Sequence, residues 1–348
     1  MIRPWRATPA RPGRASDTEG VAVSDEQRGT SPSRRTVLVT GSAAAGGLLA
    51  AGALGAGTAA AAPNSRVQSS SSAGSIEGIV EAIKRILQAD GTVSNGVLEV
   101  GINRSDLTVR GPGGIRLLQG FQLQHEFYFQ AVSSTAAMLN GDLALTAAET
   151  QPVIEAIIAQ GLVVQAFHQH LYNLEPDIWF VHFRGHGDPL HLGRAVAAVV
   201  AKTGAPLPQT SPEDPTTPLP ADRLASILGG DAAIGESGVV TVTVPRTDRV
   251  TLGGYSVRPA LGISTNVQFQ PHGTDQAAVV PDFSMTAAEI QPVIAVMGGL
   301  GWEIGCLYNQ ETDEHPQLFF SHMAKLGDPV TLAGEIRRGL DHTAAARP

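Results

Sequence analysis

The segment TAAETQPVI at residues 146–154 returns almost unchanged as TAAEIQPVI at residues 286–294. From this point, residues 146–189 align without a gap to residues 286–329, and 15 of these 44 positions are identical. Thr-Ala-Ala-Glu is a capping box, a motif that begins a helix because Thr accepts from a backbone N–H while Glu reaches back. A repeat of this length indicates one structural unit that is present twice.

Matching residues extend the repeat beyond this segment. We therefore predict repeat domains at 76–204 and 221–343, joined by a stiff, Pro-rich linker at 205–220. The further matches are Arg104-Ser105-Asp106 with Arg246-Thr247-Asp248, Phe129-Gln130 with Phe269-Gln270, His182 with His322, and Gly-Asp-Pro at 187–189 and 327–329.

Each copy has the pattern of an α+β domain. Alternating apolar residues at 97–102 predict a strand, and the apolar runs at 162–172 and 177–184 predict a β-hairpin. Asp188-Pro189 predicts the start of a final helix, with Asp as its cap. The core order β-α-β-β-α predicts an antiparallel sheet with helices packed on it.

Residues 1–62 have the composition of an export signal. Arg34-Arg35 precedes the uncharged stretch 36–62, and Ala59-Ala60-Ala61 provides small residues for cleavage. We predict a twin-arginine signal peptide, followed by a disordered Ser-rich spacer at 63–75. An uncleaved membrane anchor is the alternative, which the low hydrophobicity disfavours. Because no Cys follows the apolar stretch, we expect a secreted or cell-envelope protein rather than a lipoprotein.

Charge and cysteine content restrict the partners. The net charge is −8, and residues 1–62 hold seven of the 24 basic but only four of the 32 acidic residues. The mature chain is therefore more acidic still, which predicts no nucleic-acid partner, and we expect no integral membrane domain after signal cleavage. Cys306 is the only cysteine, so we predict no disulfide and a small buried side chain rather than a reactive thiol.

Three histidines of the first copy form a candidate metal site. His168 and His170 share a face of the predicted strand, because residues i and i+2 project to the same side. The next strand brings His182 back across the hairpin. If the residue numbers of paired positions sum to an even number, all three imidazoles project to the same side of the sheet. Such a set suits Zn²⁺, and also copper or nickel. Candidates for a fourth ligand are His125, Glu126, Glu175 and His186.

A structural role for these histidines is the alternative. His182 persists as His322 in the second copy, where Tyr308 and Gln310 replace its partners, and this favours packing or hydrogen bonding at that position. Among the acidic residues weighed as ligands, Asp142 is interpreted as a polar residue at a strand end and Asp188 as a helix cap. If the first copy binds a metal, the second copy is predicted to be degenerate.

Four segments of the sequence, given at the end of this paragraph, are similar to those of a known family. Together they resemble the LppY/LpqO-type family of exported bacterial proteins, whose function is unknown. The resemblance implies export and a small α+β domain, but no reaction. It covers nearly all of 90–204 and, more weakly, 235–340. The segments are RSDL (104–107), NGDLALT (140–146), AFHQHL (166–171) and Glu175-Pro176 to His182.

Three functions are compatible with these patterns. The first is metal binding through the histidines of copy 1. The second is a non-enzymatic module that binds a cell-envelope glycan, a peptide or a small ligand on a polar strand face. The third is a metal-dependent hydrolase, which would need a carboxylate base such as Glu126 near the histidines. The sequence assigns neither its catalytic residues nor its substrate. The polar strand face comprises Gln122, Gln124, Glu126, Tyr128 and Gln130.

Overall fold

The computed structural model describes residues 76–348, so the predicted signal peptide (1–62) and spacer (63–75) lie outside the described residues. Both repeats belong to one unit of the chain. Among the helices of residues 76–348, none has the length and apolar character needed to cross a bilayer.

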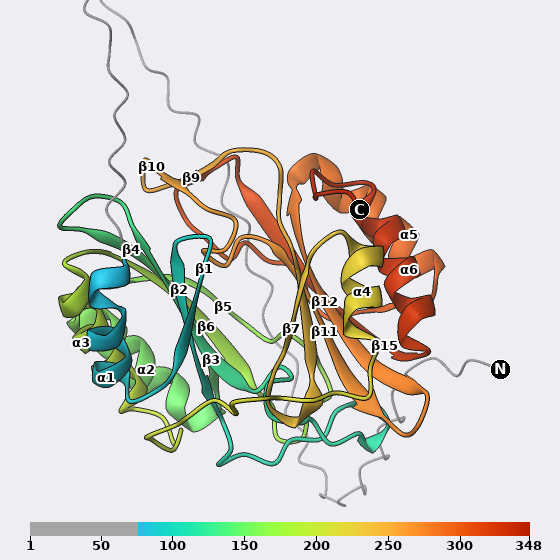
Figure 1. The fold of residues 1–348 in the computed structure, drawn as a ribbon, viewed down its shortest axis with the longest axis horizontal. Coiled ribbons are helices and arrows are strands. Elements are labelled where there is room, and N and C mark those ends of the chain that lie inside the picture. Colours follow the sequence, from blue (N-terminus) through green and yellow to red (C-terminus); the bar gives the residue numbers. More distant parts are fainter. Residues whose placement is uncertain (1–75) are drawn as a thin grey trace, which may run out of the picture. The chain divides into compact units, whose positions relative to one another are not determined.

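The first repeat is an antiparallel sheet of order β1-β2-β3-β4-β6-β5, with helices on one face (Figure 1). Leu139, Phe183 and Val196 are part of the apolar core between sheet and helices. The elements are α1 (Val80–Leu87), β1 (Gly91–Ser94), β2 (Val97–Asn103), β3 (Gln124–Ala131), β4 (Ala137–Leu145), α2 (Ala147–Ala159), β5 (Val163–His168), β6 (Trp179–Gly187) and α3 (Pro189–Val200).

The second repeat has the same topology, with sheet order β13-β15-β12-β11-β8-β7 and a small extra sheet β10-β9-β14. The predicted α+β class and its duplication are therefore confirmed. The elements are α4 (Ala221–Leu228), β7 (Asp231–Ile234), β8 (Val240–Val244), β9 (Val250–Leu252), β10 (Tyr255–Val257), β11 (Thr265–His272), β12 (Gln276–Thr286), α5 (Ala287–Gly299), β13 (Glu303–Ile304), β14 (Glu314–His315), β15 (Leu318–Gly327) and α6 (Pro329–Leu340).

Local sequence explains where the helices begin. Thr146 and Glu149 form the predicted capping box at the start of α2, and the corresponding residues do so at α5. Asp188 caps α3 by accepting a hydrogen bond from the backbone N–H of His191 at 2.7 Å. These side chains satisfy N–H groups that have no partner inside the helix.

A buried arginine ties each sheet to the helix that follows it. Arg104 has no solvent-exposed surface and donates to both Asp106 and Glu149, with N–O distances of 2.8 to 3.0 Å. Arg246 makes the equivalent contacts with Asp248 and Glu289 in the second repeat. The guanidinium presents several donors in a fixed fork, so one side chain bonds two carboxylates at once.

The helix-free faces of the two sheets pack against each other. One apolar cluster joins Leu171 and Phe180 of the first repeat to Val280 and Ala324 of the second. Another joins Tyr128 and Met138 to residues of β9, β10 and β15. The repeats therefore share buried apolar surface in addition to the covalent connection.

Two equivalent glutamines make a reciprocal contact across this interface. The side chain of Gln130 bonds the backbone at 256–258, with distances of 2.7 and 3.0 Å. Gln270, its counterpart 140 residues later, makes the same pair of bonds to the backbone at 116–118, at 2.8 and 2.9 Å. Reciprocal contacts between equivalent surfaces are the mark of two-fold symmetry. The repeats thus pack as an internal two-fold pair.

Candidate metal centre

The hairpin of β5 and β6 determines where the three predicted histidines lie. In its register, Ala166 stands opposite His182 and His168 opposite Phe180. The residue numbers of these pairs sum to an even number, as the metal hypothesis requires. His168 and His182 therefore project to the same face of the sheet, the one without helices. His170 follows the end of β5 and stacks on Phe180, with ring centroids 3.3 Å apart.

The three imidazoles converge. One ring nitrogen from each of His168, His170 and His182 lies within 4.8 Å of the others. The ring centroid of His168 is 5.0 Å from that of His182 and 5.1 Å from that of His170. Open metal sites commonly have three protein ligands, which is the number of histidines gathered here.

Most nitrogens of these rings have no hydrogen-bond partner within residues 76–348. Both nitrogens of His168, both of His182 and Nε2 of His170 are buried and unpaired in this part of the chain. Each buried polar atom left unsatisfied costs about 1–3 kcal/mol. Several such atoms in one place require a common explanation, and a bound cation would satisfy one nitrogen of each ring.

The second repeat orients His170 indirectly, through the side chain of Gln122. Nδ1 of His170 lies 2.9 Å from Oε1 of Gln122, which assigns the ring proton to Nδ1 and leaves the lone pair on Nε2. The backbone and side-chain N–H groups of Gln122 both donate to Oε1 of Gln268, at 3.0 and 2.9 Å. Metal-binding histidines commonly donate their second ring N–H in this way.

Asp142 belongs to the cluster, although its interpretation as a strand-end polar residue missed this. Its Oδ1 lies 3.6 Å from Nε2 of His182, and its Oδ2 lies 3.8 Å from Nε2 of His170. Asp142 stands opposite His182 in the β4–β6 ladder. The sequence does contain a signal, because Asp282 occupies the equivalent position of the second repeat.

Burial controls the charge of the cluster. It lowers the pKa of His168 to about 3 and the pKa values of His170 and His182 well below their usual value. The rings are therefore neutral at neutral pH, which is the form that binds metals. Burial, and then the neighbouring Glu126 and Asp282 carboxylates, raises the pKa of Asp142. A cation between these groups would relieve their mutual repulsion.

The second repeat contributes aromatic and polar groups to the same place. Tyr308, the counterpart of His168, stacks on that ring with centroids 3.5 Å apart. His322 stacks on His170 at 3.6 Å. A contact between two equivalent residues lies on the two-fold axis that relates them, so the cluster marks where the axis passes through the interface. A second group with ligand atoms within 4.8 Å comprises His168, Cys306 and His322.

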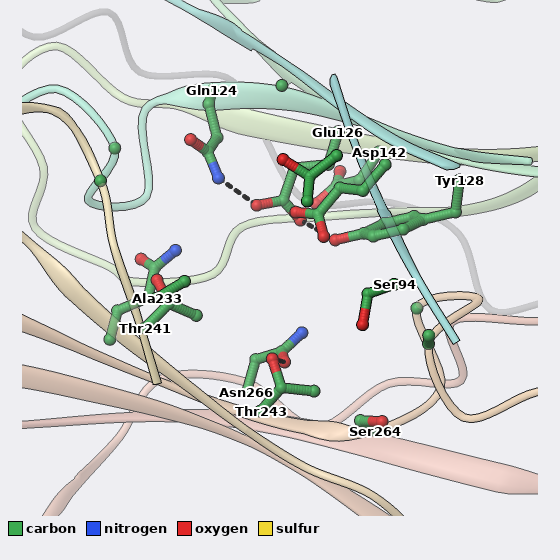
Figure 2. A pocket seen from close by; sticks show the side chains of 18 of the residues that line it. Ser94, Gln124, Glu126, Tyr128, Asp142, Ala233, Thr241, Thr243, Ser264 and Asn266 are labelled. Carbon is green, nitrogen blue, oxygen red and sulfur yellow. Dashed lines mark hydrogen bonds between the residues drawn. The ribbon is translucent and has the colours of Figure 1, made fainter. Parts of the chain in front are cut away.

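A cavity of 1010 Å³ between the repeats reaches this cluster, and its lining includes Asp142, His170 and His182. Figure 2 shows Gln124 and Tyr128 directed at Glu126, with Thr243 and Asn266 on the opposite wall. Tyr128 Oη donates to Glu126 at 2.7 Å, and the Gln124 amide also donates to that carboxylate. A small molecule in the cavity would therefore reach both a carboxylate and the histidines.

Both repeats match one family model, described as Domain of Unknown Function (DUF1259), over residues 81–202 and 222–342. The chain belongs to this family. No curated protein and no solved structure matches it. A tandem domain of unknown function is thereby confirmed, and the finer LppY/LpqO assignment stays a prediction.

In the first DUF1259 domain, His125 lies away from the cluster of His168, His170 and His182. Its Nδ1 accepts from the backbone N–H of Ala144 at 3.2 Å, and its Nε2 lies 3.3 Å from Oγ1 of Thr203. In the second DUF1259 domain, Thr265 replaces it and accepts from the equivalent N–H of Ser284 at 3.0 Å. His125 thus satisfies a backbone group inside the core and does not contribute a ligand atom to the histidine cluster.

The other predicted fourth ligands differ in their positions. His186 is exposed and stacks on Tyr255 with centroids 4.6 Å apart. Glu175 is also exposed, and its backbone pairs with that of Arg110. Glu126 alone of the predicted set lines the cavity beside the cluster. Its position in the β3–β4 ladder, opposite Asp142, explains this proximity.

Proposed function

We propose that the protein binds a divalent transition metal ion through His168, His170 and His182, with Asp142 as the fourth ligand. The observation that carries this proposal is the set of five buried ring nitrogens without a partner in the described chain. Nitrogen ligands with one carboxylate oxygen suit Zn²⁺, and also copper or nickel.

The cavity supports a second role, the binding of a small molecule at the ion. An ion among these residues would border the cavity, and a zinc site with four protein ligands can expand to five ligands to admit water or a substrate. The amide, hydroxyl and carboxylate groups of the lining favour a ligand rich in hydroxyl or amide groups, such as a cell-envelope glycan or peptide. A hydrolase would need Glu126 as its base and ranks below simple binding.

Elemental analysis of the purified chain tests metal binding. We expect stoichiometric metal in the wild type and at least a tenfold loss of affinity in His182→Ala, because one ligand is removed. His186→Ala is the matched control, since His186 lies on the same strand but is exposed. Gln122→Ala keeps all ligands and should weaken binding about 10–100-fold, because His170 loses its orienting partner. A wild type that stays metal-free after addition of Zn²⁺ or Cu²⁺ refutes the proposal.

A thermal-shift screen separates the two binding modes. A ligand that binds the native protein raises Tm by mass action. If the ion takes part, we expect the shift from a glycan or peptide fragment to disappear in His182→Ala and to persist in His186→Ala. A shift that survives both substitutions assigns the cavity to a metal-independent binding module.

We also propose that the protein is exported by the twin-arginine pathway. Arg34-Arg35 and the uncharged stretch after it support this. Cell fractionation of the full chain and of the Arg34→Lys, Arg35→Lys double variant tests it. The double variant should accumulate in the cytoplasm, and equal distribution of both proteins contradicts export by this route.

A further inference from the structure

The second repeat brings its own metal-binding groups to the cluster. Asp282 and His322 stand opposite each other in the β12–β15 ladder, as the corresponding pair does in the first repeat. Beside them lies Cys306, at the position of Ala166 in the first repeat. The Asp–His pair is therefore present twice, whereas the thiol occurs in one repeat only.

The distances between these groups match those of a metal site. Sγ of Cys306 lies 3.5 Å from Nδ1 of His322. In a tetrahedral zinc site, with Zn–S about 2.3 Å and Zn–N about 2.0 Å, sulfur and nitrogen ligands are about 3.5 Å apart. Oδ1 of Asp282 lies 3.6 Å from the same Nδ1, and no donor within residues 76–348 bonds it.

His168 connects the two sets of ligands. It belongs to the group with His170 and His182 and also to the group with Cys306 and His322. Both of its nitrogens are buried and unpaired in the described residues, so neither is committed to holding the ring in place. Each nitrogen of such a ring can bind one ion once the neutral ring has lost its N–H proton, because a neutral imidazole has only one free lone pair.

We propose that Cys306, His322 and Asp282 form a second metal position that shares His168 with the first. This inference rests on the proposed metal-binding function and extends it to a two-ion centre on the internal two-fold axis. When the second ion binds, the Cys306 thiol and the ring N–H of His168 each release a proton to solvent. The sulfur then bonds the metal as a thiolate, and His168 bridges the two ions as an imidazolate. A sulfur ligand makes this position the more selective one for soft ions such as Cu⁺ or for Zn²⁺.

Titration of the full chain with Co²⁺ tests the proposal, because thiolate ligation gives a near-ultraviolet charge-transfer band that nitrogen and oxygen ligands do not give. We expect two equivalents of cobalt and this band in the wild type. Cys306→Ala should lose the band and one equivalent, and it should fold because the first repeat has Ala166 at this position. His182→Ala should keep the band while losing the other equivalent.

The outcomes separate this inference from the proposed function. One equivalent without a thiolate band overturns the second position and leaves the histidine site intact, and the 3.5 Å contact is then an S–H···N hydrogen bond. No bound cobalt removes both proposals. A band with unchanged stoichiometry in Cys306→Ser, a closer isostere, would also contradict the assignment of sulfur as a ligand. Urea unfolding of each variant shows whether a lost equivalent reflects lost folding.

Discussion

The two repeats agree where each sheet meets its own helices and differ at several positions where the repeats meet each other. On the helix side, Arg104 and Arg246 make the same contacts, and the same capping box begins α2 and α5. On the facing side, His168 of one repeat stacks on Tyr308 of the other, although the two positions are equivalent. The contacts that stabilise the common fold therefore lie on the helix-covered face of each sheet. The residues that differ in chemistry between the repeats lie on the face where the repeats meet.

Two regions of the interface are equivalent by the internal two-fold symmetry but differ in polarity; we call them its two flanks. On one flank, the buried carboxyl of Glu311 accepts hydrogen bonds from the side-chain amides of Asn140 and Gln165. On the other flank, the equivalents of Glu311 and Asn140 are Leu171 and Val280, which belong to one apolar cluster. A centre on a two-fold axis is needed only once, so the duplicated positions around it need not be the same.

The largest expected effect tests whether the helix sides are truly equivalent. Arg104→Ala and Arg246→Ala each remove a buried cation and leave two carboxylates unpaired, which should lower the free energy of unfolding by about 3–5 kcal/mol. Urea unfolding measures this, with the exposed Arg110→Ala as the control, expected to change it by less than about 0.5 kcal/mol. A small effect at only one of the two arginines would show that the repeats do not share this anchor.

A pH-dependent effect distinguishes the polar flank from the apolar one. Burial raises the pKa of Glu311 from 4.5 to about 7. The folded state thus keeps a proton that the unfolded state releases between these values. The stabilisation is complete below pH 4.5 and is lost as pH rises to about 7, on the order of 3 kcal/mol in all.

The variant Glu311→Gln is neutral at every pH and isolates this contribution. The unfolding free energy of the wild type minus that of the variant should fall between pH 4.5 and 7 and then stay level. Urea unfolding of both proteins across this range measures it. The contributions of other titrating groups to the unfolding free energy cancel in this difference. A difference that does not change with pH would therefore show that Glu311 has an ordinary pKa and that its site is not desolvated.

The smallest of the three effects concerns the reciprocal glutamines. Gln130→Ala and Gln270→Ala each remove two hydrogen bonds and leave backbone groups at the interface unpaired, at a cost of about 2 kcal/mol. Chemical denaturation measures both, and Gln151→Ala, on the exposed surface of α2, is the matched control. If the two losses differ by more than about 1 kcal/mol, the interface is not symmetric at these positions.

Much of the fold follows from patterns within short segments. The capping boxes, the Asp188 cap and the β5–β6 hairpin are local, because the groups that interact are a few residues apart or joined by one turn. The same-side placement of His168 and His182 was predicted for an even register of that hairpin, and the structure has such a register. Asp142 was missed because its contact with His182 depends on the β4–β6 ladder, in which α2 and β5 separate the two strands along the chain.

The sequence by itself determined the duplication and the α+β class, and it predicted the three histidines on one face for an even register of the hairpin, since repeats, periodicity and side-chain alternation are properties of the linear chain. Only the tertiary structure decided that Asp142 joins them, that Gln268 of the second repeat orients His170 through Gln122, and that Cys306 meets His322 beside His168. The physical reason is that these contacts form across ladders and between the repeats. Their geometry depends on how two apolar faces pack, which no local pattern encodes.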